Sequence, residues 1–241
     1  MFVQTFEDLK KNGKVARHAL EIPQFVQSVY FKMQTAYVGL YAVLKIDDYD
    51  KYEPGYSESY SGSASIPGLG SPRDVEIVGN LCAFFTNLYS AFDVFAHVVD
   101  LVYISPPISK TKVDFDKVVK EMTNRARLSE EEITKHIVSI QESQWFKDLK
   151  PYRDCDTHIK SVLPKVRIEY QPMQILAPSK VTTFIIPDSP HVKDPKYSKN
   201  REVNVFCKSI IGEATSSIQY AFDIMEIRIR DSGRIPVNLG G

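Results

Sequence analysis

Apolar side chains recur three and four positions apart along most of the chain, which is the spacing of one face of an α-helix. In the first part of the chain this pattern predicts a long helix over about 23–46, with Pro23 at a first helical position that needs no N–H donor. The residues that recur at this spacing are Val26, Val29, Met33, Tyr37, Leu40 and Leu44.

A second long helix is predicted from Ser71 to about Tyr103. Ser71 offers an N-cap, and Pro72 and Asp74 suit the first turn. Apolar residues then occur nearly all round the helix, which indicates a central position. Polar groups that are costly in a bilayer interrupt this stretch, so we expect a buried helix and no membrane span. They are Asn80, Asn87, Asp93, His97 and Asp100.

The second half of the chain contains the signals of four more helices. A short amphipathic helix is expected at about 115–122, and a capping box at Ser129–Glu132 predicts the start of another, with Ile133, Ile137 and Ile140 on one face. Pro151 predicts a fresh helix that can run only as far as Pro164. The last helix is expected to be long, over about 202–230.

Two stretches are not helical in pattern. Residues 47–70 are rich in Asp, Tyr, Ser, Gly and Pro, which predicts a flexible surface loop. Alternating apolar residues at about 165–187 predict a β-hairpin. We therefore expect one mainly α domain over 1–241, an up-and-down helical bundle with a small β-hairpin insertion before the last long helix.

Composition narrows the function classes. The 241 residues are 43% hydrophobic and 25% charged, and 30 Lys and Arg balance 30 Asp and Glu, so no global field attracts nucleic acid or cations. Cys82, Cys155 and Cys207 are too few and too scattered for a disulfide framework or a thiolate zinc site. The amino terminus lacks the pattern of a signal peptide. A reduced, cytoplasmic location is the expectation.

The stretch Tyr152–His158 contains the residues best suited to chemistry. Arg153 can hold a phosphate through its planar guanidinium, and His158 can exchange a proton near neutral pH. Asp154 lies four positions before His158, so on a helix its carboxylate could orient the imidazole. Placed just after Pro151, Arg153 would also lie beside the unpaired N–H groups of a helix start. Six basic residues against three acidic ones make the surrounding segment, 147–167, locally positive.

An Arg, a polar residue and then a His five positions after the Arg, on a helix of an up-and-down bundle, resemble the Arg-x(4-6)-His motif of HEPN domains. Trp145, Phe146 and Tyr152 are similar to the aromatic residues that precede the motif in such proteins. The resemblance implies a metal-independent endoribonuclease with Arg153, Asp154 and His158 as site residues and no cofactor. It also implies RNA as substrate, a homodimer that shares the site, and a protein partner such as an antitoxin. Asp154 departs from the Asn that is familiar after the Arg.

Three alternatives remain open from the residues. A non-catalytic helical module could recognise a protein or nucleotide through the hairpin and the loop. A metal-dependent hydrolase could use Asp93, His97 and Asp100, which fall at i, i+4 and i+7 on one helical face. Alternatively, Arg153 could simply form an ion pair with Asp148 or Asp156.

Overall fold

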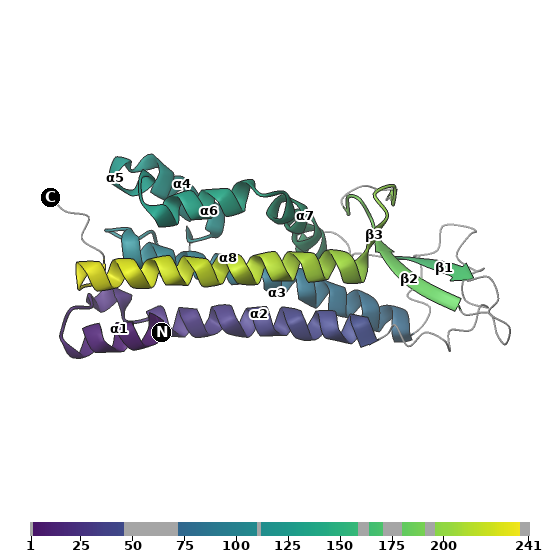
Figure 1. The fold of residues 1–241 in the computed structure, drawn as a ribbon, viewed down its shortest axis with the longest axis horizontal. Coiled ribbons are helices and arrows are strands. Elements are labelled where there is room, and N and C mark those ends of the chain that lie inside the picture. The colour runs from purple at the N-terminus through teal and green to yellow at the C-terminus, as the bar shows by residue number, and fades with distance from the viewer. Residues whose placement is uncertain are drawn as a thin grey trace. The chain divides into compact units, whose positions relative to one another are not determined.

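The computed structural model describes residues 2–45, 72–109, 112–158, 164–170, 180–190 and 196–236, without the side chains at 72–75, 155–158, 165–170 and 180–182. Over these ranges the protein is mainly helical, with a small antiparallel hairpin before the last long helix, as predicted (Figure 1). The predicted loop at 47–70 lies outside the described residues.

Eight α-helices and a short 3-10 turn make up most of the described chain. They are α1 (Phe2–Lys11), η1 (Arg17–Ala19), α2 (Ile22–Lys45), α3 (Pro72–Tyr103), α4 (Phe115–Asn124), α5 (Ala126–Ser129), α6 (Glu132–Glu142), α7 (Gln144–His158) and α8 (Val203–Ser232). The bounds of α2, α3 and α8 fall within about two residues of the predicted ones. Helix α1 was not predicted, although Phe2 and Phe6 on it are buried.

The chain divides into two compact units, and α2, α3, α7 and α8 each contribute to both. Unit 1 comprises Met1–Gln34, Asn87–Leu149 and Ile210–Gly241; unit 2 comprises Thr35–Thr86 and Lys150–Ser209.

The core of unit 1 is rich in aromatic rings. Phe92 of α3 lies 5.5 Å from Phe115 of α4 and 5.2 Å from Phe146 of α7, measured between ring centroids. Phe222 of α8 contacts Phe2 of α1 at 5.3 Å and Phe95 of α3 at 5.6 Å. Edge-to-face and tilted pairs of this kind bury large apolar areas, so these rings hold the helices of unit 1 together.

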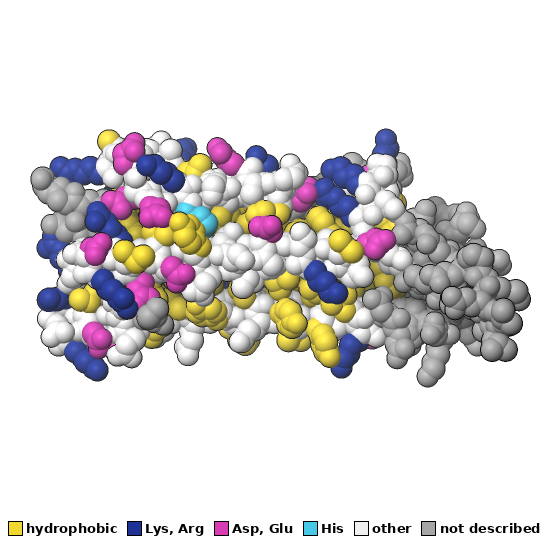
Figure 2. Space-filling model, viewed as in Figure 1, with side chains coloured by type: hydrophobic (Ala, Val, Ile, Leu, Met, Phe, Trp, Pro, Cys, Tyr) yellow, Lys and Arg dark blue, Asp and Glu magenta, His cyan; other side chains and the backbone are white. Residues whose placement is uncertain are grey.

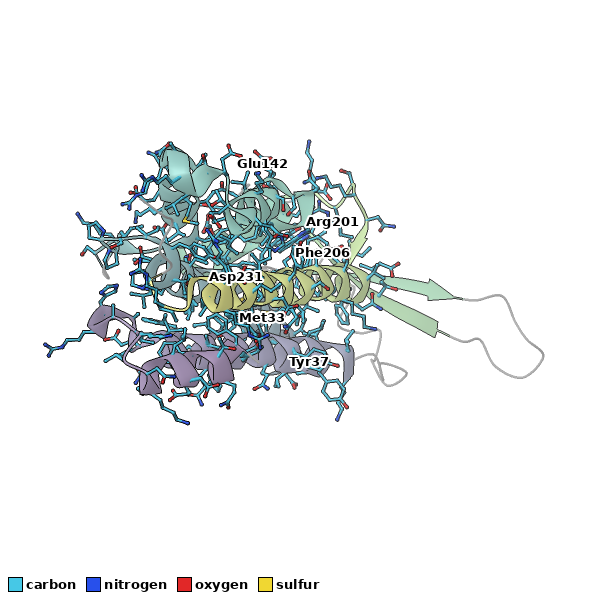
Figure 3. The ribbon with its side chains drawn as sticks, turned by 60° about the vertical axis from the view of Figure 1, so that its left-hand side comes forward. Met33, Tyr37, Glu142, Arg201, Phe206 and Asp231 are labelled. Atoms are coloured by element: carbon cyan, nitrogen blue, oxygen red, sulfur yellow. The ribbon has the colours of Figure 1, made fainter. Side chains whose placement is uncertain are left out.

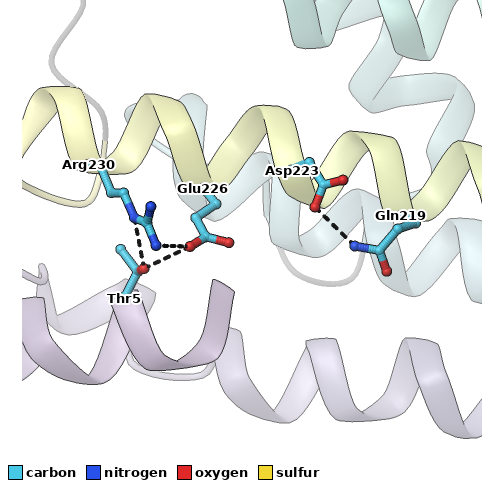
Figure 4. A network of polar contacts seen from close by, with 5 residues as sticks. All are labelled: Thr5, Gln219, Asp223, Glu226 and Arg230. Carbon is cyan, nitrogen blue, oxygen red and sulfur yellow. Dashed lines mark hydrogen bonds and ion pairs between the residues drawn. The ribbon is translucent and has the colours of Figure 1, made fainter. Parts of the chain in front are cut away.

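A polar network also joins α1 to α8 within unit 1 (Figure 4). Glu226 is buried and forms an ion pair with Arg230 one helical turn later. Thr5 Oγ1 donates a hydrogen bond of 3.1 Å to the same carboxylate, and Arg230 Nε approaches Thr5 Oγ1 at 3.4 Å. The buried charge of Glu226 is thus compensated by its neighbours, which is the arrangement expected of a structural carboxylate.

In unit 2, α2 and α3 approach closely at a glycine. A Cβ atom built on Gly39 would lie 2.9 Å from the carbonyl oxygen of Asn80 and 3.4 Å from the amide nitrogen of Phe84. No side chain fits at this position without a shift of the α3 backbone, so glycine allows the two helices to meet.

The strands of unit 2 form a small antiparallel sheet in the order β1 (Lys165–Tyr170), β2 (Lys180–Ile186) and β3 (Arg201–Glu202). Lys165 pairs with Ile185 and Tyr170 with Lys180, which confirms the predicted hairpin. Strand β3, not predicted, leads directly into α8 (Figure 1).

Helix α3 is the most apolar helix of the described chain. Its stretch Glu76–Tyr103 is long and apolar enough to cross a membrane by length and composition alone, but 56% of its apolar window is buried inside the protein. The core helix of a protein that does not cross a membrane can be equally long and apolar. Phe84, Phe85, Phe92 and Phe95 on this helix are fully buried. The prediction of a buried helix is therefore in agreement with the structure.

The predicted capping box at Ser129–Glu132 is wrong. Ser129 is the last residue of the short helix α5, and its hydroxyl donates to the carbonyl of Ala126 at 3.0 Å. The N-cap of α6 is Glu131, whose side chain makes no capping hydrogen bond. Helix α5 has no recognisable pattern in the sequence, so it was not predicted. The start of α6 therefore lies two residues later than expected.

Candidate functional site

Helix α7 begins before Pro151, contrary to prediction. It starts at Gln144, and the hydroxyl of Ser143 accepts a hydrogen bond of 3.3 Å from the amide of Phe146, in the manner of an N-cap. Phe146, Leu149 and Tyr152 are buried at intervals of three positions. Their packing carries the helix through Pro151, whose missing N–H removes a backbone hydrogen bond inside it.

The position of Arg153 in the helix changes as a result. Arg153, Asp154 and His158 all lie on α7, but in its last two turns rather than its first two. The unpaired N–H groups of a helix start are therefore not beside Arg153. The end of a helix instead presents carbonyl groups and favours cations. The motif remains on one helix, but the predicted anion-binding contribution of that helix is wrong.

Arg153 and Asp154 form an ion pair. Nη1 of Arg153 donates to Oδ1 of Asp154 at 2.7 Å, with 26% and 30% of the two side chains exposed. From the sequence, the carboxylate of Asp154 was expected to orient the imidazole of His158 instead. The pair is partly open to solvent, so it is reachable by a ligand.

Tyr152 anchors this end of α7 within unit 2. Its ring stacks on Phe85 of α3 at 4.8 Å and meets Phe206 of α8 edge-on at 5.6 Å. Its hydroxyl donates to the carbonyl of Pro187, just after β2, at 2.5 Å. The buried Tyr152 thereby holds the residue next to it, Arg153, in a defined place.

Arg201 adds a second guanidinium to this part of unit 2. Its Nη1 lies 3.4 Å from the hydroxyl of Tyr152, and its Cζ lies 4.9 Å from the ring centroid of Phe206 (Figure 3). A guanidinium over an aromatic face is a favourable cation–π arrangement. The sequence gave no sign of this contact, because 49 positions separate Tyr152 from Arg201 along the chain.

The side chain of His158 lies outside the described residues, as do those of Cys155, Asp156 and Thr157. The backbone places His158 as the last residue of α7. The contact between Asp154 and His158 therefore stays a prediction.

The proposed metal ligands Asp93, His97 and Asp100 are engaged separately. Oδ1 of Asp93 accepts from the amide of Phe115 at 3.2 Å. The ring of His97 stacks face to face on Phe25, with centroids 4.7 Å apart. In the part of the chain that the structure describes, no three His, Cys, Asp or Glu side chains group so as to hold a metal ion. Asp93, His97 and Asp100 therefore do not form a group of metal ligands in the structure.

Asp100 is instead a buried structural carboxylate. Its Oδ1 accepts from the amide of Ile108 at 2.9 Å, which fixes the segment that follows α3. Burial raises the pKa of Asp100 to about 6, although the Ile108 amide and the charges of Arg125 and His18 act in the opposite direction.

The hydroxyl of Tyr103 and Nε of Arg228 are buried without a hydrogen-bond partner. Burial raises the pKa of Tyr103 above its usual range. Nη2 of Arg228 donates to Glu131 at 2.9 Å, so this guanidinium joins α8 to the start of α6. These contacts are structural in character and bring no nucleophile or general base together.

Comparison of the chain with protein-family models, curated proteins and solved structures finds no match. The end of α7 therefore stands as a candidate site on its own residues and geometry.

Proposed function

We propose that this protein is a HEPN-like, metal-independent endoribonuclease whose site is the end of α7. The observation that carries the proposal is the partly exposed ion pair of Arg153 and Asp154, which lie five and four positions before His158 on the same helix. An arginine supplies a cation for a phosphate and a histidine a group that transfers protons, and together these suffice to cleave RNA without a metal.

Arg153 is the proposed phosphate ligand. A guanidinium has five N–H donors in a rigid fork, which matches the geometry of a phosphodiester, and the contact from Nη1 to Asp154 keeps the group in place. Tyr152, fixed by Phe85 and Pro187, limits the movement of this turn of the helix.

His158 is the proposed proton-transfer group. In the reaction a base removes the proton of the ribose 2′-hydroxyl, and the 2′-oxygen attacks the neighbouring phosphorus. The bond to the 5′-oxygen then breaks, and an acid protonates that oxygen. We assign His158 the acid role in this reaction.

Side chains five helical positions apart leave the helix in directions that differ by about 140°. A second copy of the chain would bring an arginine and a histidine to one phosphate from opposite sides. The proposal therefore includes a homodimer, with a protein partner as a regulator, and a cytoplasmic location. Cys207 is a free thiol, which suits a reducing compartment.

The test is cleavage of labelled RNAs in EDTA by purified protein. We expect Arg153→Ala and His158→Ala each to lower the cleavage rate by about 100-fold or more. Lys147→Ala is the matched control, because it removes a positive charge from an exposed position of the same helix. Its rate should stay within about threefold of the wild type. Cleavage at the wild-type rate in all three variants would show that Arg153 and His158 take no part in the reaction. An absence of turnover on any RNA would favour a non-catalytic binding module.

A further inference from the structure

Unit 1 contains two buried polar atoms whose capacity for hydrogen bonds is unused within the described residues. The hydroxyl of Tyr103, the last residue of α3, belongs to a side chain that is only 3% exposed. Nε of Arg228 on α8 is buried as well. Neither atom has a hydrogen-bond partner among the residues that the structure describes. A buried donor without a partner destabilises a folded protein, so the two atoms together indicate a ligand.

The ion pair of Arg228 shows where this ligand would lie. Nη2 of Arg228 donates to Oε1 of Glu131, the N-cap residue of α6, at 2.9 Å. Nε and Nη2 are bonded to the same carbon atom of the planar guanidinium. A ligand that accepts a hydrogen bond from Nε therefore lies close to the Glu131 carboxylate.

The Tyr103 hydroxyl lies near the same ion pair. Burial raises the pKa of Tyr103, the charge of Glu131 raises it further, and the charge of Arg228 lowers it. Both charged groups therefore act on the hydroxyl, although it forms no direct hydrogen bond with either of them. A single small ligand between the hydroxyl and the ion pair would satisfy both buried atoms.

The charges at this place decide which ligand fits. Nε of Arg228 can only donate, so a metal cation cannot bind against it. An anion would be repelled by Glu131 and by Glu132, whose charge also raises the pKa of Tyr103. Acidic and basic side chains are interspersed on the surface that α6 and the second half of α8 form, so no field of one sign attracts an ion (Figure 2). A water molecule can accept from Nε and donate to a carboxylate at the same time.

We infer that a buried water molecule binds between Tyr103, Arg228 and Glu131 and joins α3, α6 and α8 within unit 1. It accepts hydrogen bonds from the Tyr103 hydroxyl and from Nε of Arg228, and it donates one to the Glu131 carboxylate. Buried waters typically make about three hydrogen bonds to groups that the protein leaves unpaired. The inference concerns unit 1 alone and is independent of the proposed cleavage of RNA at the end of α7.

A double-mutant cycle, measured by urea denaturation of the full chain, tests the inference. Tyr103→Phe removes the hydroxyl and keeps the ring, whereas Arg228→Lys keeps the charge beside Glu131 and removes Nε. Each variant should raise the equilibrium constant for unfolding by about tenfold, because each takes one partner from the water. The double variant should fall at least about threefold short of the product of the two increases, because both substitutions disturb the same water.

Tyr220→Phe combined with Arg228→Lys is the control cycle. The hydroxyl of Tyr220 donates to Glu132 at 2.8 Å, so it shares no ligand with Arg228 in the inferred site. The two effects should therefore multiply to within about twofold. A Tyr103→Phe protein more stable than the wild type would overturn the inference, because removal of a hydroxyl without a partner relieves the cost of its burial. Effects of Tyr103→Phe and Arg228→Lys that simply multiply would overturn it too.

A crystal structure of the wild type at a resolution that shows ordered water is the direct measurement. We expect one water about 2.7–3.2 Å from both the hydroxyl oxygen of Tyr103 and Nε of Arg228. Hydrogen bonds from these two atoms to other groups of the protein, with no water between them, would overturn the inference. An ion at this position would do the same.

Discussion

Arg153 and Asp154, neighbours near the end of α7, share a hydrogen-bonded ion pair with 2.7 Å between Nη1 and Oδ1. The carboxylate offsets the charge of the arginine proposed to hold the phosphate. The pair thus orients the guanidinium and weakens its attraction for RNA at the same time.

Asp154→Asn separates these two effects. Removal of the negative charge should tighten RNA binding by about fivefold, since a partly exposed pair contributes on the order of 1 kcal/mol. Turnover should fall, because His158 loses the proposed carboxylate partner. Fluorescence anisotropy and single-turnover cleavage measure the two quantities. Weaker RNA binding by the variant would show that Asp154 does not oppose the phosphate.

Tyr152→Phe removes one hydroxyl and keeps the aromatic stack. The carbonyl of Pro187, which is buried, then loses its donor at 2.5 Å. We expect a loss of about 1–2 kcal/mol in the free energy of unfolding, measured by urea denaturation. The control is Tyr220→Phe, whose exposed hydroxyl contacts Glu132 at 2.8 Å and whose loss should cost clearly less than that of the Tyr152 hydroxyl. Equal losses in both variants would contradict a special role for the Tyr152 contact.

Two glycines on neighbouring helices should respond in opposite directions to the same substitution. Gly39→Ala should destabilise the protein by about 1–3 kcal/mol, because the new methyl group would lie 2.9 Å from the carbonyl of Asn80. At Gly79 of α3 no atom lies within 4 Å of the added Cβ. Gly79→Ala should therefore stabilise the helix by up to about 1 kcal/mol. Thermal and urea unfolding measure the change in the free energy of unfolding of each variant. A Gly39→Ala variant more stable than the wild type would contradict the close approach of α2 and α3.

Asp100 should make stability depend on pH. Its pKa is raised to about 6, chiefly by burial and further by Glu121, so the folded protein binds its proton more tightly than the unfolded chain does. Its contribution is therefore fully present below about pH 4 and is lost as the pH rises through 6. Asp100→Asn, which keeps an oxygen for the Ile108 amide, should be the more stable protein at pH 7.5, by roughly 2 kcal/mol.

The difference between Asp100→Asn and the wild type should shrink towards pH 4. Asp223→Asn is the control, because it makes the same substitution at an exposed position of α8. A wild type that gains stability relative to Asp100→Asn between pH 4 and 7.5 would show that its neighbours favour the charged form.

The helices were predictable from local patterns, whereas their contacts were not. α2, α3 and α8 follow from apolar spacing and from Pro72 at a helix start. The start of α7 was missed because proline usually opens a helix, and here the burial of Tyr152 outweighs the hydrogen bond that Pro151 removes. Tyr37 was placed by spacing among buried residues, but Gly39 sets which side of α2 meets α3.

The same limit applies to the candidate site. That Arg153, Asp154 and His158 share one helix could be read from the sequence. That Asp154 pairs with Arg153 depends on side-chain rotamers, and that Arg201 approaches Tyr152 depends on contacts far apart along the chain. Helical spacing likewise suggested a metal site at Asp93, His97 and Asp100, but each residue is used by a different neighbour.

The most direct test of the proposed chemistry is the nature of the RNA ends after cleavage in EDTA. Attack by the 2′-hydroxyl should leave a 2′,3′-cyclic phosphate and a 5′-hydroxyl. A single 2′-deoxy nucleotide at the cleavage position should block the reaction, and so should Arg153→Ala and His158→Ala. Products with a 3′-hydroxyl and a 5′-phosphate, or cleavage that stops when the metal is chelated, would contradict a metal-independent reaction at the end of α7.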